Sequence, residues 1–198
     1  MRDDLSETAL GELWRSGARP ELVTRLLRAY GPEILSYLMA TLRADGDATE
    51  AFSLFTLSVW QGSAGFRGES SFRTWAYALA RHAAGRVLRE RGRQRRQVAL
   101  SNVPEIDELA ARIRTDTLGY LRTEVRDRVA RLRDELEPDE QTILILRVDR
   151  GFAWPDVARV LADGAPEAEA DVARRVVALR KRFERIKDKL RRRAAELG

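Results

Sequence analysis

The residues best suited to chemistry lie between positions 66 and 96, where aromatic side chains are interleaved with arginines. An aromatic ring can stack on an unpaired base while a neighbouring guanidinium neutralises the phosphate backbone, and single strands are often held in this way. The aromatic residues are Phe66, Phe72, Trp75 and Tyr77, and the arginines are Arg67, Arg73, Arg81, Arg86 and Arg89. The segment therefore predicts a surface for single-stranded nucleic acid.

A hydrophobic core is the alternative explanation for these aromatic residues. We favour it for Phe72 and Trp75, which lie on the apolar face of a predicted helix over 71–91. It suits four other residues less well, because they lie in or beside a glycine-rich stretch, 61–69, that predicts a loop. These four are Phe66, Arg67, Ser70 and Ser71. A loop followed by a serine-capped helix also offers backbone N–H groups and a positive helix end to a phosphate or an extruded base.

A second group of cations lies near the C-terminus, on a predicted helix over 168–196. Two short predicted helices precede it, and this order is typical of a helix-turn-helix DNA-binding domain. The cations are Arg174, Arg175, Arg180, Lys181, Arg182 and Arg185. Arginines there could donate to guanine edges or phosphates in a major groove. A solvated amphipathic helix is the alternative, and the acidic turn over 163–171 is long for a helix-turn-helix.

The composition excludes several other kinds of chemistry. The 198 residues include no cysteine and a single histidine, His82, which excludes disulfides, thiol nucleophiles, cysteine zinc sites and multi-histidine metal centres. We therefore expect no catalytic residue, no cofactor and no metal. The net charge is +7 over 61–100, −4 over 101–140 and +5 over 141–198. Two positive blocks suggest a polyanion contacted at two places.

The elements that must position these residues are helices. Apolar residues recur at helical spacing along most of the chain, and no strand-like alternation persists. In the first half of the chain we expect helices over 21–43 with a break at Gly31-Pro32, over 48–60 with a cap from Asp47 and Glu50, and over 71–91 with a cap from Ser70. In the second half we expect helices over about 105–135, over Ile143–Val148 with an end at Gly151, from Trp154-Pro155 onward, and over 168–196. The predicted fold class is all-α.

We expect these helices to form two small domains. The predicted parts are an N-terminal extension over 1–20, a helical domain over 21–96, a linker and connecting helix over 97–135, and a helix-turn-helix domain over 136–198. The extension could dock on the first domain or stay mobile. No apolar run is long enough to cross a bilayer, and no signal-peptide stretch is present, so we expect a soluble intracellular protein.

The segment FRGESSFRTWAYALAR, residues 66–81, is very similar to the signature of bacterial ECF (extracytoplasmic-function) sigma factors, the small two-domain initiation subunits of RNA polymerase. Weaker similarity covers DATEAFSLFTLSVW (47–60) and LEPDEQTILILRVDRGFAWPDVARVLA (136–162). The resemblance implies that the first domain binds core RNA polymerase and melts the minus-ten promoter element, and that the second reads the minus-thirty-five element. It also implies a cytoplasmic protein that is not an enzyme, and family members are often held by an anti-sigma factor.

The resemblance implies three sets of contact residues in this sequence. The minus-ten set is Phe66, Arg67, Gly68, Ser70, Ser71, Arg73, Tyr77, Arg81, His82, Arg86 and Arg89. The minus-thirty-five set is Asp171, Arg174, Arg175, Arg180 and Arg182, and the long turn before the last helix leaves its register open. The core-polymerase set is Glu50, Ser53, Leu54, Leu57 and Trp60.

The sequence departs from the family pattern at a few of these positions. Ser53 and Leu54 replace polar residues expected to face the polymerase, so that interface is expected to be more apolar or weaker. His82 and Arg86 stand where Asn and Asp are common, which puts the usual minus-ten preference in doubt, and His82 could contact a base or be a surface residue. Ala153 stands where Ser or Thr often caps a helix.

Two other functions are alternatives to a sigma factor. A diverged DNA-binding regulator that does not productively engage polymerase is motivated by Ser53 and Leu54. A metal-dependent nuclease would need acidic residues at two-metal spacing beside the basic helices, and no such cluster stands out. We therefore expect a sigma factor.

Overall fold

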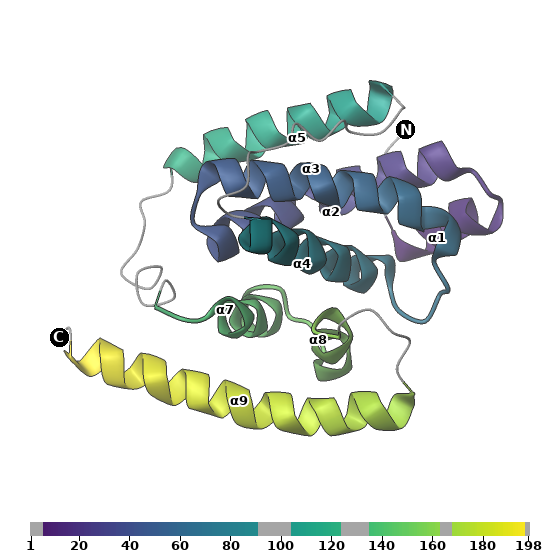
Figure 1. Cartoon of the computed structure of the whole chain (residues 1–198). Helices are drawn as coiled ribbons and strands as arrows, with labels where there is room; N and C mark the ends of the chain where they lie inside the picture. The colour runs from purple at the N-terminus through teal and green to yellow at the C-terminus, as the bar shows by residue number, and fades with distance from the viewer. Residues whose placement is uncertain (1–5, 91–103, 124–134, 163–167, 197–198) are drawn as a thin grey trace. The chain divides into compact units, whose positions relative to one another are not determined.

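The computed structural model describes residues 6–90, 104–123, 135–162 and 168–196. The regular secondary structure of these residues is helical, which confirms the all-α fold (Figure 1). The chain forms two compact units, residues 1–123 and residues 124–198. The predicted limits of the two domains, 21–96 and 136–198, stay predictions.

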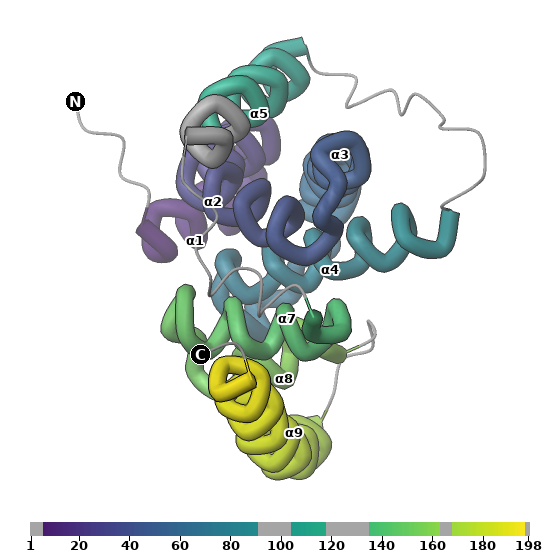
Figure 2. Tube along the Cα trace, turned by 90° about the vertical axis from the view of Figure 1, so that its left-hand side faces the viewer, coloured from purple at the N-terminus to yellow at the C-terminus, as the bar shows by residue number. Residues whose placement is uncertain are grey.

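The first unit is a bundle built on three long helices. Its elements are α1 (Glu7–Arg15), α2 (Arg19–Leu42), α3 (Asp45–Gly62), η1 (Ser63–Gly65), α4 (Phe72–Glu90) and α5 (Pro104–Thr123). α2, α3 and α4 pack on one another around fully buried Tyr37, Phe52, Phe55 and Tyr77. α5 lies along α2, as Figure 2 shows. α1 also docks on α2, because Leu10 is fully buried.

The predicted break at Gly31-Pro32 is wrong, because α2 continues through both residues. Gly31 is buried where α5 crosses, and a Cβ there would lie 2.8 Å from Ile113 Cδ1. The glycine therefore serves a close helix approach. Pro32 is exposed and removes one N–H donor, while fully buried Leu27 and Ile34 on either side hold the helix together.

α3 begins earlier than predicted, and its predicted cap is wrong. Ala44 is the N-cap and makes no side-chain cap hydrogen bond. Asp45 and Asp47 lie instead in the first turn, where a negative charge is favourable next to the free N–H groups. At its other end α3 runs to Gly62 and is followed by η1, so only residues 66–69 of the predicted loop over 61–69 lack helical structure, and the observed loop extends over 66–71.

The second unit consists of α7 (Pro138–Leu144), a π-helical turn η2 (Ile145–Asp149), α8 (Trp154–Val160) and the 28-residue α9 (Glu169–Glu196). α7 begins with a capping box between Glu137 and Glu140. Ala153 precedes α8 without a side-chain cap hydrogen bond, as the sequence predicted. The buried face of α9 carries Val172, Leu179 and Ile186, which repeat every seven residues.

The helix over 104–123 confirms the start of the predicted helix over about 105–135. Residues 124–134 of that prediction lie outside the described part of the chain. Within the described part, no helix is long and apolar enough to cross a membrane.

Candidate nucleic-acid interface

Phe66 is part of the core, contrary to the sequence interpretation. Only 8% of its surface is exposed. Its ring stacks on Phe72 at a centroid distance of 4.3 Å, contacts Trp75 at 5.3 Å and meets the edge of Trp14 at 5.5 Å. Phe72 is buried as predicted, and Trp75 is half-buried. The two phenylalanine rings of this cluster are therefore closed to a base, whereas Trp14 and Trp75 keep part of their surface exposed.

The loop over 66–71 nevertheless presents polar groups. Arg67, Gly68, Glu69 and Ser71 are exposed, and Ser70 is half-buried. Gly68 has a φ of 73°, a left-handed conformation that glycine adopts without strain. The loop thus combines an anchored start at Phe66 with an exposed arginine directly after it.

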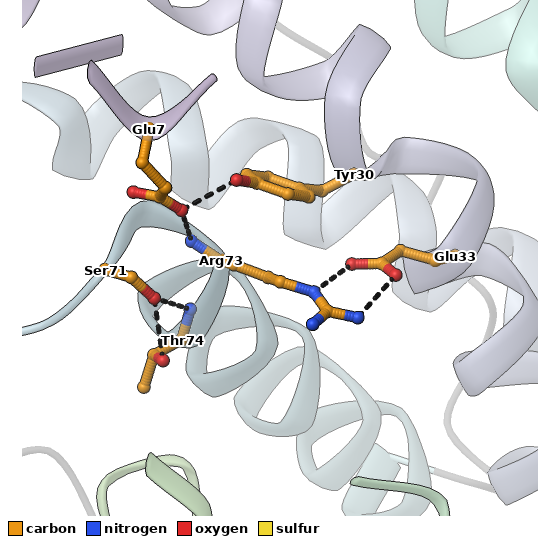
Figure 3. Close-up of polar contacts among 6 residues, drawn as sticks. All are labelled: Glu7, Tyr30, Glu33, Ser71, Arg73 and Thr74. Carbon is orange, nitrogen blue, oxygen red and sulfur yellow. Dashed lines mark hydrogen bonds and ion pairs between the residues drawn. The ribbon is translucent and has the colours of Figure 1, made fainter. Parts of the chain in front are cut away.

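The first N–H groups of α4 are already bonded within the protein (Figure 3). The Glu7 carboxylate accepts from the backbone N–H of Phe72 at 2.8 Å and from that of Arg73 at 2.9 Å. The N–H of Thr74 donates to Ser71 Oγ at 3.0 Å, so Ser71 caps the helix and the predicted cap at Ser70 is wrong. These three amides are not open to a phosphate, which corrects that part of the sequence interpretation.

Arg73 and Tyr77 are also used inside the first unit. The Arg73 guanidinium makes a two-pronged ion pair with Glu33, with distances of 2.8 Å and 2.9 Å. That hydrogen bonding raises the pKa of Arg73. Tyr77 has no exposed surface and packs on Tyr37 at 5.4 Å. Tyr77 therefore fills the core of the first unit, and its predicted contact with DNA stays a prediction.

The exposed face of α4 brings three predicted residues into one stripe. His82, Arg86 and Arg89 are exposed at spacings of four and three residues, while Ala83 and Val87 are buried on the opposite face. Arg86 forms an ion pair with Glu90 at 3.1 Å on the surface. Arg81 is half-buried. The stripe exposes two arginines and one imidazole.

The basic face of α9 is divided between exposed and engaged arginines. Arg174 and Arg180 are exposed, and Arg174 pairs with Asp171. Arg175 is half-buried and donates to the carbonyl oxygen of Leu161 at 3.3 Å, which ties α9 to the end of α8. Arg182 lies 4.0 Å from Asp139 of α7.

Three further exposed residues of α9 belong to this face, and they are Val177, Lys181 and Arg185. Val177 lies between Arg174 and Arg180 in the sequence and is 56% exposed. Lys181 follows it one helical turn later. The exposed part of α9 thus carries cations around an apolar group.

The predicted polymerase surface on α3 is only partly accessible. Glu50, Ser53, Leu57 and Trp60 are half-buried. Leu54 is 4% exposed and belongs to the core, and its predicted contact with polymerase stays a prediction.

The same α3 face is engaged by residues that sequence reasoning missed. Arg114 of α5 donates to Ser53 Oγ at 3.3 Å, and burial lowers the pKa of Arg114. Arg19 lies over the Trp60 ring at 4.5 Å and donates to the carbonyl oxygen of Trp60. No sequence pattern pointed to Arg114, Arg19 or Glu7, because their partners are 41 to 66 residues away.

The described residues include no group of three or more His, Asp or Glu side chains that could hold a metal ion. The exposed groups of the candidate interface are cations of α4 and α9 and the loop over 66–71.

Comparison with known proteins agrees with the resemblance. A family model described as sigma-70 region 2 matches residues 26–94. The chain is 26% identical over 140 residues to the RNA polymerase sigma-H factor of Pseudomonas aeruginosa, covering 69% of this chain and 72% of that protein. It is 25% identical over 169 residues to the RNA polymerase sigma factor YlaC of Bacillus subtilis, covering 84% of this chain and 94% of that protein. No solved structure matches the chain significantly.

Proposed function

Because this chain belongs to the ECF sigma-70 family of RNA polymerase sigma factors, we propose that it binds core RNA polymerase and directs it to a two-part promoter. The match of residues 26–94 to sigma-70 region 2 is the observation that carries this proposal. The protein acts by binding and strand separation in the cytoplasm, without a cofactor.

The minus-ten element is assigned to the first unit. Support comes from the loop over 66–71, which exposes Arg67, and from the exposed stripe of His82, Arg86 and Arg89 on α4. Cations along a helix can follow a strand's phosphates, while the loop holds a base that has left the duplex. Three other predicted residues support α4 and the loop from within the first unit: Phe66 and Tyr77 are buried in the core, and Arg73 is paired with Glu33.

The minus-thirty-five element is assigned to the second unit. α8 and α9 follow the order of a helix-turn-helix, and α9 exposes Arg174 and Arg180 near its N-terminal half. Exposed arginines on such a helix are suited to base edges and phosphates in the major groove. Arg175 orients α9 through Leu161 instead of reading a base.

Core polymerase is assigned to the α3 face that carries Glu50, Ser53 and Leu57. The alternative function is a DNA-binding regulator without productive polymerase binding, and two observations favour it. Leu54 is buried, and Ser53 accepts a hydrogen bond from Arg114. An anti-sigma factor belongs to the proposal as a further partner.

Reconstitution with core polymerase tests the proposal. The expected result is promoter-dependent transcription from genomic fragments that this protein and polymerase occupy together in cells. Stoichiometric capture of polymerase by the purified chain would exclude the diverged regulator. A chain that captures no polymerase and supports no transcription from any fragment would contradict the sigma-factor function.

A further inference from the structure

Helix α1 supplies the cap of a helix that begins 65 residues later. Glu7 Oε2 accepts from the N–H of Phe72, and Glu7 Oε1 accepts from the N–H of Arg73 at 2.9 Å. The same Oε1 accepts from the Tyr30 hydroxyl at 2.7 Å. Figure 3 shows the carboxylate between Tyr30 and the start of α4. Three donors from α2 and α4 therefore converge on one side chain of α1.

A carboxylate at this place is physically favourable. The first N–H groups of a helix have no partner within the helix, and the helix dipole makes its N-terminus positive. Ser71 satisfies the N–H of Thr74, and the two amides that remain ahead of it, those of Phe72 and Arg73, are satisfied by Glu7. Charge-assisted bonds of this kind are stronger than bonds between neutral groups.

α1 also contacts the other end of the same loop. The edge of Trp14 meets the ring of Phe66, at a centroid distance of 5.5 Å. Atoms of the Trp14 ring lie 3.7 Å and 3.8 Å from the position that a Cβ would occupy on Gly68. α1 therefore contacts the loop at its start, lies close to its left-handed glycine, and bonds to the first two residues of α4 that follow it.

These contacts fix the segment that exposes Arg67, Glu69 and Ser71. A loop that is already held in its binding conformation loses less conformational entropy when a ligand binds. Glu7 and Trp14 are two turns apart on one helix, so they act on the loop together.

We propose that Glu7 is a positioning residue, which holds the loop over 66–71 in the shape that receives the melted promoter strand. The inference rests on the proposed function, because it assigns the minus-ten strand to that loop. Glu7 contacts the first turn of α4, directly after the loop, through the backbone N–H groups of Phe72 and Arg73, and has no need to touch the DNA itself. Its partner Tyr30 keeps the carboxylate turned towards α4.

Glu7→Gln is the direct test, with Glu12→Gln as the matched control. Glu12 lies on the same helix, is exposed and undergoes the same change of charge. The full chain is combined with core polymerase and a promoter fragment from the genomic map. We expect Glu7→Gln to slow open-complex formation by about tenfold or more, the effect of losing a charge-assisted hydrogen bond. Affinity for core polymerase should stay unchanged, and so should every property of Glu12→Gln.

Hydrogen exchange of the free protein gives a readout that does not depend on polymerase. The backbone amides of Phe72 and Arg73 should exchange about tenfold faster or more in Glu7→Gln, while amides in the middle of α2 should keep their protection. Tyr30→Phe removes a single hydroxyl donor and should change the same two amides by a smaller factor. Tyr30→Phe therefore tests the same inference if Glu7→Gln proves too unstable to measure.

The outcomes separate this inference from the proposed function. A wild-type chain that opens no promoter contradicts the proposed function. Wild type and Glu7→Gln opening the promoter equally fast would contradict this inference alone. It would also be contradicted if the loss of opening were matched by an equal loss of polymerase affinity, since that result indicates general destabilisation of the first unit.

Discussion

At the scale of single residues, neighbouring positions in the loop over 66–71 have opposite roles. Phe66 is buried among Trp14, Phe72 and Trp75, whereas Arg67 is exposed. The interleaved aromatic and basic pattern thus separates into a core half and a surface half. Base stacking by Phe66 would require that the cluster open, and nothing in its packing favours that.

Phe66→Ala should destabilise the first unit. Removing a buried aromatic ring should lower the free energy of unfolding by about 3–5 kcal/mol, because the cavity among three other rings cannot fully close. Chemical denaturation of the full chain measures this change. Arg67→Ala is the control and should leave stability unchanged while weakening promoter binding. Equal stability of the two variants would show that Phe66 is not a core residue.

Arg175→Ala should weaken DNA binding without changing its sequence preference. Arg175 donates to the Leu161 carbonyl, so its loss removes about 1 kcal/mol of stabilisation and loosens α9 against α8. Binding measured over a set of promoter variants should fall by a similar factor for all of them. Arg174→Ala replaces the exposed neighbouring arginine and serves as the comparison. Its loss of binding should depend on the base pair at one promoter position. If Arg175→Ala altered the preference at a single base pair, Arg175 would be a base-reading residue.

At the scale of elements, α5 is a docked part of the first unit. Ile106, Ala110 and Ile113 are buried, and Ile113 fits against Gly31 of α2. Arg114, the next residue along α5, reaches Ser53 of α3. The segment that the sequence assigned to a linker therefore covers part of the α2 and α3 surface.

The effect of Gly31→Ala on the stability of the first unit should depend on the residue at position 113. In the wild type the new Cβ would lie 2.8 Å from Ile113 Cδ1, so the substitution should destabilise by about 1–3 kcal/mol through overpacking. In an Ile113→Ala background that clash is absent, and alanine is a better helix former than glycine by about 1 kcal/mol. The substitution should then be neutral or stabilising. A double-mutant cycle by thermal denaturation measures the coupling, and simple additivity would mean that the two residues do not touch.

At the scale of the whole molecule, the positive charge is divided between two compact units. α4 of the first unit and α9 of the second each expose arginines. If both contact DNA phosphates, affinity should fall steeply with salt, because each neutralised phosphate releases a counterion.

Arg89→Ala and Arg180→Ala should therefore have independent effects on salt dependence. Each should reduce the slope of log affinity against log salt by about one, and the double variant by about two, since the residues belong to different units. Fluorescence anisotropy of the holoenzyme with a promoter fragment, over a range of salt concentrations, gives the slope. Glu12→Gln, which removes a negative charge from α1, should not reduce the slope. If the slope in one of the arginine variants equals that of the wild type, the arginine replaced in that variant does not contact a phosphate.

The sequence alone determined the all-α fold, the approximate helices and the family. Helix periodicity, glycine-rich turns and the 66–81 signature are local, so each can be read within a few turns of chain. Locality also explains the errors. Gly31-Pro32 has the composition of a break and Asp47 with Glu50 that of a cap, yet α2 and α3 follow their tertiary packing instead.

Only the tertiary structure decided which polar and aromatic groups remain at the surface. Glu7 caps α4, Trp14 packs on Phe66, and Arg114 reaches Ser53. Each contact joins residues that are about 50 or more positions apart, and a helical pattern shows that a face is buried without showing which side chain covers it. For this reason the sequence pointed to the loop over 66–71, whereas the helix that holds the loop in place is visible only in the folded protein.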